Sequence, residues 1–168
     1  MPTPTEELIT KTTIGTAVAS YTFSSISGAY TDLILQSSVF FVSNGADRYV
    51  SMQVGNGSVD TGSNYSWTYL DTYGGTVNSG RSANQTITLS SYSANPTLAN
   101  PQSATQQFNN YSNTTTYKTI LSRFGSVPSE TGAYVSLWRS TSAINTIKLI
   151  ANGANFDVGS TFALYGVL

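Results

Sequence analysis

Hydrophobic and polar residues alternate along most of this chain, and a period of two predicts β-strands. Val50, Met52 and Val54, for example, alternate with Ser51 and Gln53. Apolar residues repeat at helical spacing over a few positions at most, and strong helix formers are sparse. The pattern therefore predicts an all-β fold.

Two segments, residues 33–42 and 144–151, are apolar on both faces, which is typical of a central strand or of one covered by a neighbour. Gly, Asn, Pro and Ser interrupt the alternation roughly every 8–15 residues. We expect strands over residues 17–23, 33–42, 49–54, 65–70, 87–89, 117–124, 133–139, 144–151 and 161–168, and a surface loop over 91–103. This spacing predicts an antiparallel β-sandwich of roughly nine or ten strands with a jelly-roll-like topology, in a single domain at residues 12–168.

The first residues differ from the rest, and we expect an extended arm over residues 1–11. Pro2 and Pro4 favour an extended backbone, and Leu8 with Ile9 supplies an apolar anchor. Such an arm can add a strand to a neighbouring protein or clamp it. The alternative is a frayed terminus.

The chain has no histidine and no cysteine, and its charged residues are seven lysines or arginines and eight aspartates or glutamates among 168 residues. Enzymes usually build nucleophiles, bases and transition-metal sites from histidine and cysteine. The composition therefore predicts a protein that is not an enzyme and that has no cofactor and no metal. Serine, threonine and asparagine supply 62 residues, which favours a neutral surface that packs against neighbours or holds polar ligands.

The net charge is −1, and the basic residues are scattered. Nucleic-acid binding needs clustered cations, so we expect no nucleic acid as a partner. Near-zero net charge does little to keep copies apart, which favours assembly. No apolar run is long enough to span a membrane and the N-terminus lacks a signal-peptide pattern, so we expect synthesis in a cytoplasm and no membrane partner.

Tyr65, Trp67 and Tyr69 form an aromatic row on one face of an expected strand. Such a row can serve as a platform for sugar rings, although aromatic residues on a strand face more often belong to a core. Further along, Trp138 precedes Arg139. We expect Arg139 either at a rim or partly buried beside a carboxylate.

The acidic residues offer two further candidates. The segment 60–64, Asp-Thr-Gly-Ser-Asn, presents oxygen ligands like those of a calcium loop, but an Asx turn explains it better. A glycoside hydrolase would need two acids held about 5–10 Å apart, and the sequence pairs none of its acids in this way. The acids available are Asp32, Asp47, Asp60, Asp71, Glu130 and Asp157.

Four groups of residues share their order and spacing with a known family. They are Tyr-Thr-Phe-Ser-Ser-Ile (21–26) with Tyr-Thr-Asp-Leu-Ile-Leu (30–35), Thr-Gly-Ser-Asn-Tyr-Ser (61–66), Val-Ser-Leu-Trp-Arg-Ser-Thr-Ser-Ala-Ile-Asn-Thr-Ile (135–147), and Gly-Ser-Thr-Phe-Ala-Leu-Tyr-Gly (159–166). Together they resemble small bacteriophage virion proteins of phages that infect marine and freshwater bacteria. The resemblance extends from about residue 21 to the last residue, and residues 123–133 depart from the family pattern.

The resemblance implies a structural component of the virion, made in the host cytoplasm. The leading expectation is a non-enzymatic capsid decoration or cement protein that binds the major capsid protein across subunits and self-associates, for example as a trimer. The residues expected to bind partners are Pro2, Pro4, Leu8, Ile9, Phe40 and Val42, with Ile147 and Leu149 as a further apolar pair.

The alternative is a tail-fibre or receptor-binding module that recognises a host surface glycan. Under this alternative the glycan-binding residues are Tyr65, Trp67 and Tyr69.

Overall fold

The computed structural model describes residues 5–42, 47–94, 100–127 and 130–168. Within these ranges it contains thirteen strands and no helix, so the prediction of an all-β fold is confirmed and no helix there could cross a membrane. The strands are, in chain order, β1 (Glu6–Thr13), β2 (Ser20–Phe23), β3 (Asp32–Val39), β4 (Asp47–Asn56), β5 (Ser58–Val59), β6 (Tyr65–Tyr73), β7 (Thr76–Gln85), β8 (Thr88–Ala94), β9 (Gln102–Phe108), β10 (Lys118–Ser126), β11 (Glu130–Trp138), β12 (Thr146–Asn152) and β13 (Thr161–Val167).

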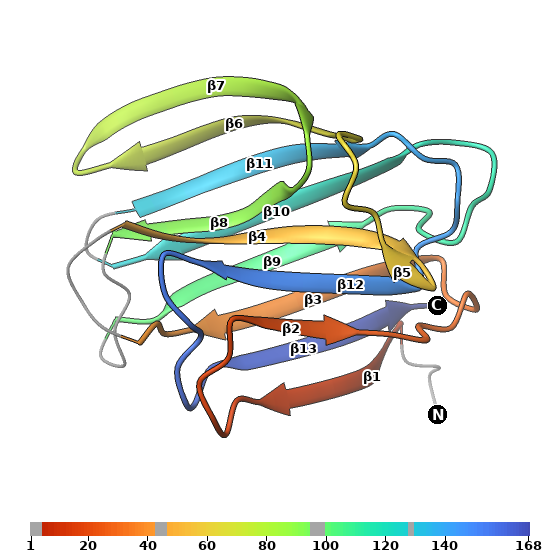
Figure 1. The fold of residues 1–168 in the computed structure, drawn as a ribbon, viewed down its shortest axis with the longest axis horizontal. Coiled ribbons are helices and arrows are strands. Elements are labelled where there is room, and N and C mark those ends of the chain that lie inside the picture. The colour runs from red at the N-terminus through yellow and green to blue at the C-terminus, as the bar shows by residue number, and fades with distance from the viewer. Residues whose placement is uncertain (1–4, 43–46, 95–99, 128–129) are drawn as a thin grey trace.

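Two antiparallel sheets form the layers of a β-sandwich, as predicted (Figure 1). The larger sheet has eight strands in the order β1-β13-β3-β9-β10-β11-β6-β7. The smaller sheet runs β2-β12-β4, and both β5 and β8 pair with β4. The main core lies between the sheets and includes Leu33 and Phe162 from the larger sheet and Met52 and Ile147 from the smaller one. Complete burial of each such side chain contributes roughly 1.5–3 kcal/mol to stability.

The strand pairs are nested along the chain, as in one long hairpin that has been rolled up. From the inside outwards the pairs are β6/β7, β4/β8, β3/β9, β2/β12 and β1/β13. Successive pairs alternate between the larger and the smaller sheet, which is the arrangement of a jelly roll. The β10–β11 hairpin is an addition, inserted between β9 and β6 in the larger sheet.

Four of the thirteen strands, β1, β5, β7 and β9, were not predicted as strands. β5 has only two residues, and the side chains of β7 and β9 do not alternate between apolar and polar. Nearly all of β7 is exposed, and it contains Gly80 and Asn78. The inward positions of β9 include Gln102 and Gln106, which are polar yet completely buried. The predicted loop over 91–103 is therefore shorter, because β8 ends at residue 94 and β9 begins at residue 102.

The expected N-terminal arm also differs in the structure. Residues 6–13 form β1 and pair along β13, so the expected boundary at residues 11 and 12 falls inside an edge strand of the sandwich. The physical reason is that the outer edge of β13 offers backbone donors and acceptors that an adjacent strand can satisfy. Pro2 and Pro4 lie outside the described residues.

The join between β1 and β13 depends on a glycine. The ring of Tyr30 lies so close to Gly166 that a Cβ atom at that position would be 2.3 Å from two of the ring carbons. The hydroxyl of Tyr30 donates a hydrogen bond to Glu7 Oε2 at 3.2 Å. The ring therefore crosses β13 and reaches β1, and it can do so because residue 166 has no side chain.

We expect Gly166→Ala to lower the free energy of unfolding by about 1–3 kcal/mol, because the added methyl group must displace the Tyr30 ring or the strand. Urea unfolding followed by fluorescence measures this loss. Gly15→Ala is the matched control, since nothing lies within 4 Å of a Cβ atom there. An equal loss in both variants would contradict the role assigned to Tyr30.

Candidate functional site

The outward-pointing residues of the eight-stranded sheet form three rows that cross all eight strands, and we call this surface the outer face. The first row is Leu8, Tyr165, Ile34, Gln107, Leu121, Val135, Thr68 and Arg81. The second row is Lys11, Ala163, Gln36, Thr105, Arg123, Ala133, Leu70 and Ser79. The third row is Thr13, Thr161, Ser38, Ser103, Gly125, Thr131, Thr72 and Val77.

The outer face exposes aliphatic side chains beside hydroxyl groups. Val77 is 67% exposed, Leu70 is 58% exposed and Leu8 is 50% exposed. Leu121 and Val135 are also exposed, and they lie directly opposite each other on neighbouring strands. Leu8 lies on β1 at one edge of the sheet, whereas the other four lie together on β10, β11, β6 and β7 at the other end. Exposed aliphatic groups that lie together are a common feature of surfaces that bind other proteins.

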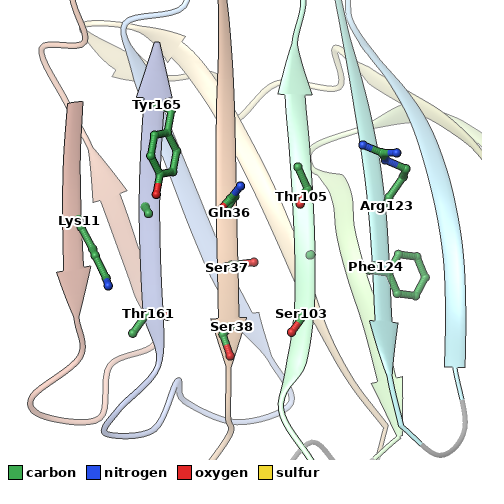
Figure 2. A pocket seen from close by; sticks show the side chains of 12 residues that line it. Lys11, Gln36, Ser37, Ser38, Ser103, Thr105, Arg123, Phe124, Thr161 and Tyr165 are labelled. Carbon is green, nitrogen blue, oxygen red and sulfur yellow. The ribbon is translucent and has the colours of Figure 1, made fainter. Parts of the chain in front are cut away.

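A shallow hollow of about 680 Å³ lies on the outer face between β1 and β10. Figure 2 shows Lys11 on one side of the hollow and Arg123 on the other, with Gln36 and Thr105 between them. Four strand spacings separate β1 from β10, which is roughly 19 Å. Of the described residues that line the hollow, two are basic and none is acidic. The hollow therefore suits a partner that carries negative groups.

The inward side of the same sheet carries a second hollow of about 450 Å³, which we call the aromatic groove. It exists because the larger sheet is wider than the smaller one, so that β6 and β7 lie past β8, an edge strand of the smaller sheet (Figure 1). Its aromatic residues are Trp67, Tyr69, Tyr73, Tyr92, Phe124 and Tyr134. Its main polar residues are Asp71, Asn78, Ser82 and Glu130.

Glycines allow the rings of the groove to pack closely. Tyr69 lies against β7 at Gly80, where a Cβ atom would be 2.8 Å from the ring. Tyr69 meets Tyr134 edge to face, with ring centroids 5.9 Å apart, and Tyr134 packs on Phe124 at 4.8 Å. Phe124 in turn comes within 2.7 Å of the place that a Cβ atom on Gly132 would take. The groove is thus lined by rings that hold one another in position.

Polar groups gather around the hydroxyl of Tyr134. Burial raises the pKa of Tyr134, and the nearby carboxylates of Asp71 and Glu130 raise this pKa further. Its hydroxyl therefore stays protonated at neutral pH and remains a hydrogen-bond donor. Tyr69 and Tyr92 pack against the same cluster of side chains as Tyr134.

The predicted aromatic row is divided between the core and the groove. Tyr65 is completely buried, and its hydroxyl accepts a hydrogen bond from Val54 N at 3.0 Å and donates one to the carbonyl oxygen of Asp60 at 2.9 Å. Tyr65 is therefore a core residue that links the two sheets. Trp67 and Tyr69 are partly buried and line the groove.

The carboxylate of Asp60 is occupied by donors of the protein. Oδ1 accepts a hydrogen bond from Gly62 N, and Oδ2 accepts hydrogen bonds from Asn64 Nδ2 and Trp138 Nε1, each at 2.8 Å. Burial raises the pKa of Asp60, but these three hydrogen bonds outweigh burial and leave the pKa below its usual value. The segment 60–64 is thus an Asx turn. This agrees with the prediction from the sequence, which favoured an Asx turn over a calcium loop.

Arg139 lies at a rim. Its guanidinium donates to Asn84 Oδ1 at 3.0 Å and to Ser66 Oγ at 3.4 Å. These bonds join the loop after β11 to the start of β6 and the end of β7. Of the two positions expected for Arg139, a rim or a partly buried place beside a carboxylate, the structure shows the rim.

Among the acids considered for hydrolysis whose side chains the structure describes, two lie together, Asp71 and Glu130, both in the groove. Asp32 accepts a hydrogen bond from Asn110 N, and Asp157 accepts one from Val158 N. Both of these acids stabilise turns. The side chain of Asp47 lies outside the described residues.

The residues expected to bind partners are spread over several surfaces. Leu8 lies in the first row of the outer face, whereas Ile9 packs against the main core. Val42 is 39% exposed. Phe40 is partly buried, and its ring lies 3.3 Å from the position of a Cβ atom on Gly159. The four described residues therefore do not form one patch.

The further apolar pair is placed differently from the expectation. Ile147 and Leu149 point into the core and are at most 1% exposed, because β12 is covered by the larger sheet on that face. They are thus unable to meet a neighbouring protein. Conversely, the pattern gave no signal for Asn78, Tyr92 and Tyr134 as groove residues, because strand order alone brings them together.

No protein-family model matches this sequence, and no curated protein matches it either. The resemblance to small phage virion proteins therefore stays a prediction. The function has to be inferred from the two surfaces of the larger sheet.

We expect Tyr65→Phe to lower the free energy of unfolding by about 1–3 kcal/mol, because it leaves buried backbone groups without their partner. Chemical unfolding measures the loss. Tyr165→Phe is the control, since Tyr165 lies on the outer face with its hydroxyl at the surface side of the sheet. Similar stability of the Tyr65→Phe variant and the wild type would show that the hydroxyl does not link the sheets.

We expect Asp60→Asn to cost about 1–3 kcal/mol at pH 7, because the amide replaces an acceptor by a donor that faces other donors. The lowered pKa of Asp60 means that its contribution is present above the unfolded-state pKa near 3.9 and is lost as the pH falls through the folded-state value. The difference between wild type and variant should therefore shrink as the pH falls below about 4. Asp157→Asn, which affects a single hydrogen bond, serves as the control in these unfolding experiments.

Proposed function

We propose that this protein is a non-enzymatic structural component of a bacteriophage particle that decorates the capsid and binds it through the outer face. The observation that carries the proposal is the outer face itself, with exposed aliphatic residues and hydroxyl groups in three continuous rows. The scarcity of charge and the resemblance to small virion proteins support the same function. The jelly-roll sandwich is a fold that viral capsid and lectin domains use, among others.

The size of the outer face suits a specific interface. Eight strands span roughly 34 Å, and three rows with their margins cover roughly 20 Å along the strands. The product is roughly 700 Å², close to the roughly 800 Å² that each partner contributes to a standard interface. One copy could therefore bind a capsid surface without help from other regions.

The charges of the outer face favour a partner of opposite sign. Its three rows contain Lys11, Arg81 and Arg123 and no acidic residue. The carboxylates that point to the same side of the sheet, Glu6 and Asp32, lie beyond the first row on β1 and β3. Two copies that met face to face would bring like charges together, which disfavours self-association through this surface. We therefore assign the outer face to an acidic, partly apolar surface of the major capsid protein.

The mechanism of such a protein is geometric. Each copy lies across a joint between capsid subunits, and many copies together resist expansion of the shell. A rigid sandwich transmits strain because its core is closely packed. Self-association, for example as a trimer, belongs to the same proposal, and the long exposed strand β7 at the edge of the larger sheet offers backbone groups for it.

The alternative, a tail-fibre or receptor-binding module, is favoured by a different observation, the aromatic groove. The outer face and the groove lie on opposite sides of the larger sheet. A virion protein can therefore use both.

We expect Arg123→Glu to weaken binding to capsid shells at least about tenfold, because the new carboxylate meets acidic groups of the partner. Co-sedimentation with shells from which the protein has been stripped measures the affinity. Lys148→Glu is the matched control, since Lys148 belongs to β12 in the smaller sheet, away from the outer face. Equal binding by the two variants would refute the assignment of the outer face.

Immunogold labelling of virions that contain the protein tests its location. Label over the head is the expected result. Label confined to the tail would sink the capsid proposal and favour the alternative.

A further inference from the structure

The aromatic groove is not used by the proposed contact with the capsid, because it opens on the other side of the sheet. We propose that it binds a neutral or N-acetylated sugar, as a segment of an oligosaccharide. This inference does not depend on the capsid proposal. It names a second binding surface on the same molecule.

The groove presents aromatic rings that are only partly buried. Trp67 is partly buried, and its cross-strand neighbours are the small residues Ser82 and Ser136. Two positions further along β6 lies Tyr69, supported from behind at Gly80. The apolar face of a sugar ring can stack on such rings, since aromatic faces offer large contact areas at small entropic cost.

The groove also runs far enough to take more than one sugar. Residues 67, 69, 71 and 73 of β6 all line it, and three two-residue steps along a strand span roughly 20 Å. Its volume of about 450 Å³ lies within the roughly 300–1,000 Å³ of known ligand sites. Tyr73, 49% exposed, stands at the far end. The shape favours a chain segment over a single enclosed molecule.

Polar groups converge on the same space. Asp71 and Asn78 are direct cross-strand neighbours, so a carboxylate and an amide lie side by side. Tyr134 adds a protonated hydroxyl close to Asp71. Acceptors and donors placed in this way suit hydroxyl groups, which both donate and accept hydrogen bonds.

The carboxylates that line the groove favour uncharged sugars over acidic ones. A uronic acid or a sulfated sugar would bring a negative charge next to Asp71, where it would be repelled. A neutral hexose or an N-acetylated hexosamine meets no such barrier. Acidic sugars would instead find positive charge on the outer face, beside Lys11 and Arg123.

The chain contains two tryptophans, and one of them can report sugar binding by its fluorescence. Trp138 is 3% exposed and bonded to Asp60, whereas Trp67 lines the groove. A change of tryptophan fluorescence upon addition of a sugar therefore originates at Trp67. This allows titration of the unmodified protein.

The test begins with the full chain on an array of neutral, N-acetylated and acidic oligosaccharides. The best neutral probe, such as an oligomer of glucose or of N-acetylglucosamine, is then titrated by fluorescence and calorimetry. We expect Asp71→Ala and Trp67→Ala each to weaken binding about tenfold or more. Leu70→Ala is the matched control, since Leu70 is on the same strand but points to the outer face.

Three outcomes would overturn the inference. The first is no bound oligosaccharide and no fluorescence change at concentrations up to about 10 mM. The second is unchanged affinity in both groove variants when circular dichroism shows them folded. The third is binding of acidic sugars alone that is lost in Arg123→Glu, which would place the site on the outer face.

The same variants separate this inference from the capsid proposal. Trp67→Ala should leave co-sedimentation with capsid shells unchanged, and Arg123→Glu should leave neutral sugar binding unchanged. Cleavage of the bound oligosaccharide would support the site and contradict the non-enzymatic function.

Discussion

The unequal width of the two sheets is the constraint on which both candidate surfaces depend. Nested pairing places three of the five strand pairs in the larger sheet and two in the smaller, and the β10–β11 hairpin widens the larger sheet again. The smaller sheet can therefore cover only part of the inner face opposite to it. The uncovered inner side of β6 and β7 becomes the aromatic groove, and the outer face becomes eight strands wide.

The part of the larger sheet that the smaller sheet does not cover is held in place by hydrogen bonds near the start of β6 and the end of β7. Tyr65 at the start of β6 bonds to Val54 of β4, and Asp60 joins the preceding loop to Trp138 of β11. Arg139 adds bonds to the loop and to the end of β7. A groove held in this way is largely formed before a ligand arrives, so that little conformational entropy is lost on binding.

The net charge of −1 conceals a separation of charges between two sides of one sheet. Lys11, Arg81 and Arg123 point from the outer face, whereas Asp71 and Glu130 line the groove. Because charges act mainly within about 8 Å in physiological salt, each side attracts its own class of partner. Lys11, Arg81 and Arg123 are far apart in the sequence, but the register of the strands places all three on the outer face.

Period-two alternation was enough to predict an all-β sandwich and most of its strands, because burial of one face acts locally on residues two apart. It failed for β7, which is nearly all exposed, and for β9, where polar residues such as Gln106 occupy buried positions. In neither strand does burial of one face produce an alternation of apolar and polar residues. Trp67 and Tyr69 could be named as candidates from the sequence, whereas Tyr92 and Tyr134 could not. These residues meet only through the order and register of strands, and that order depends on long-range pairing that residue spacing does not encode.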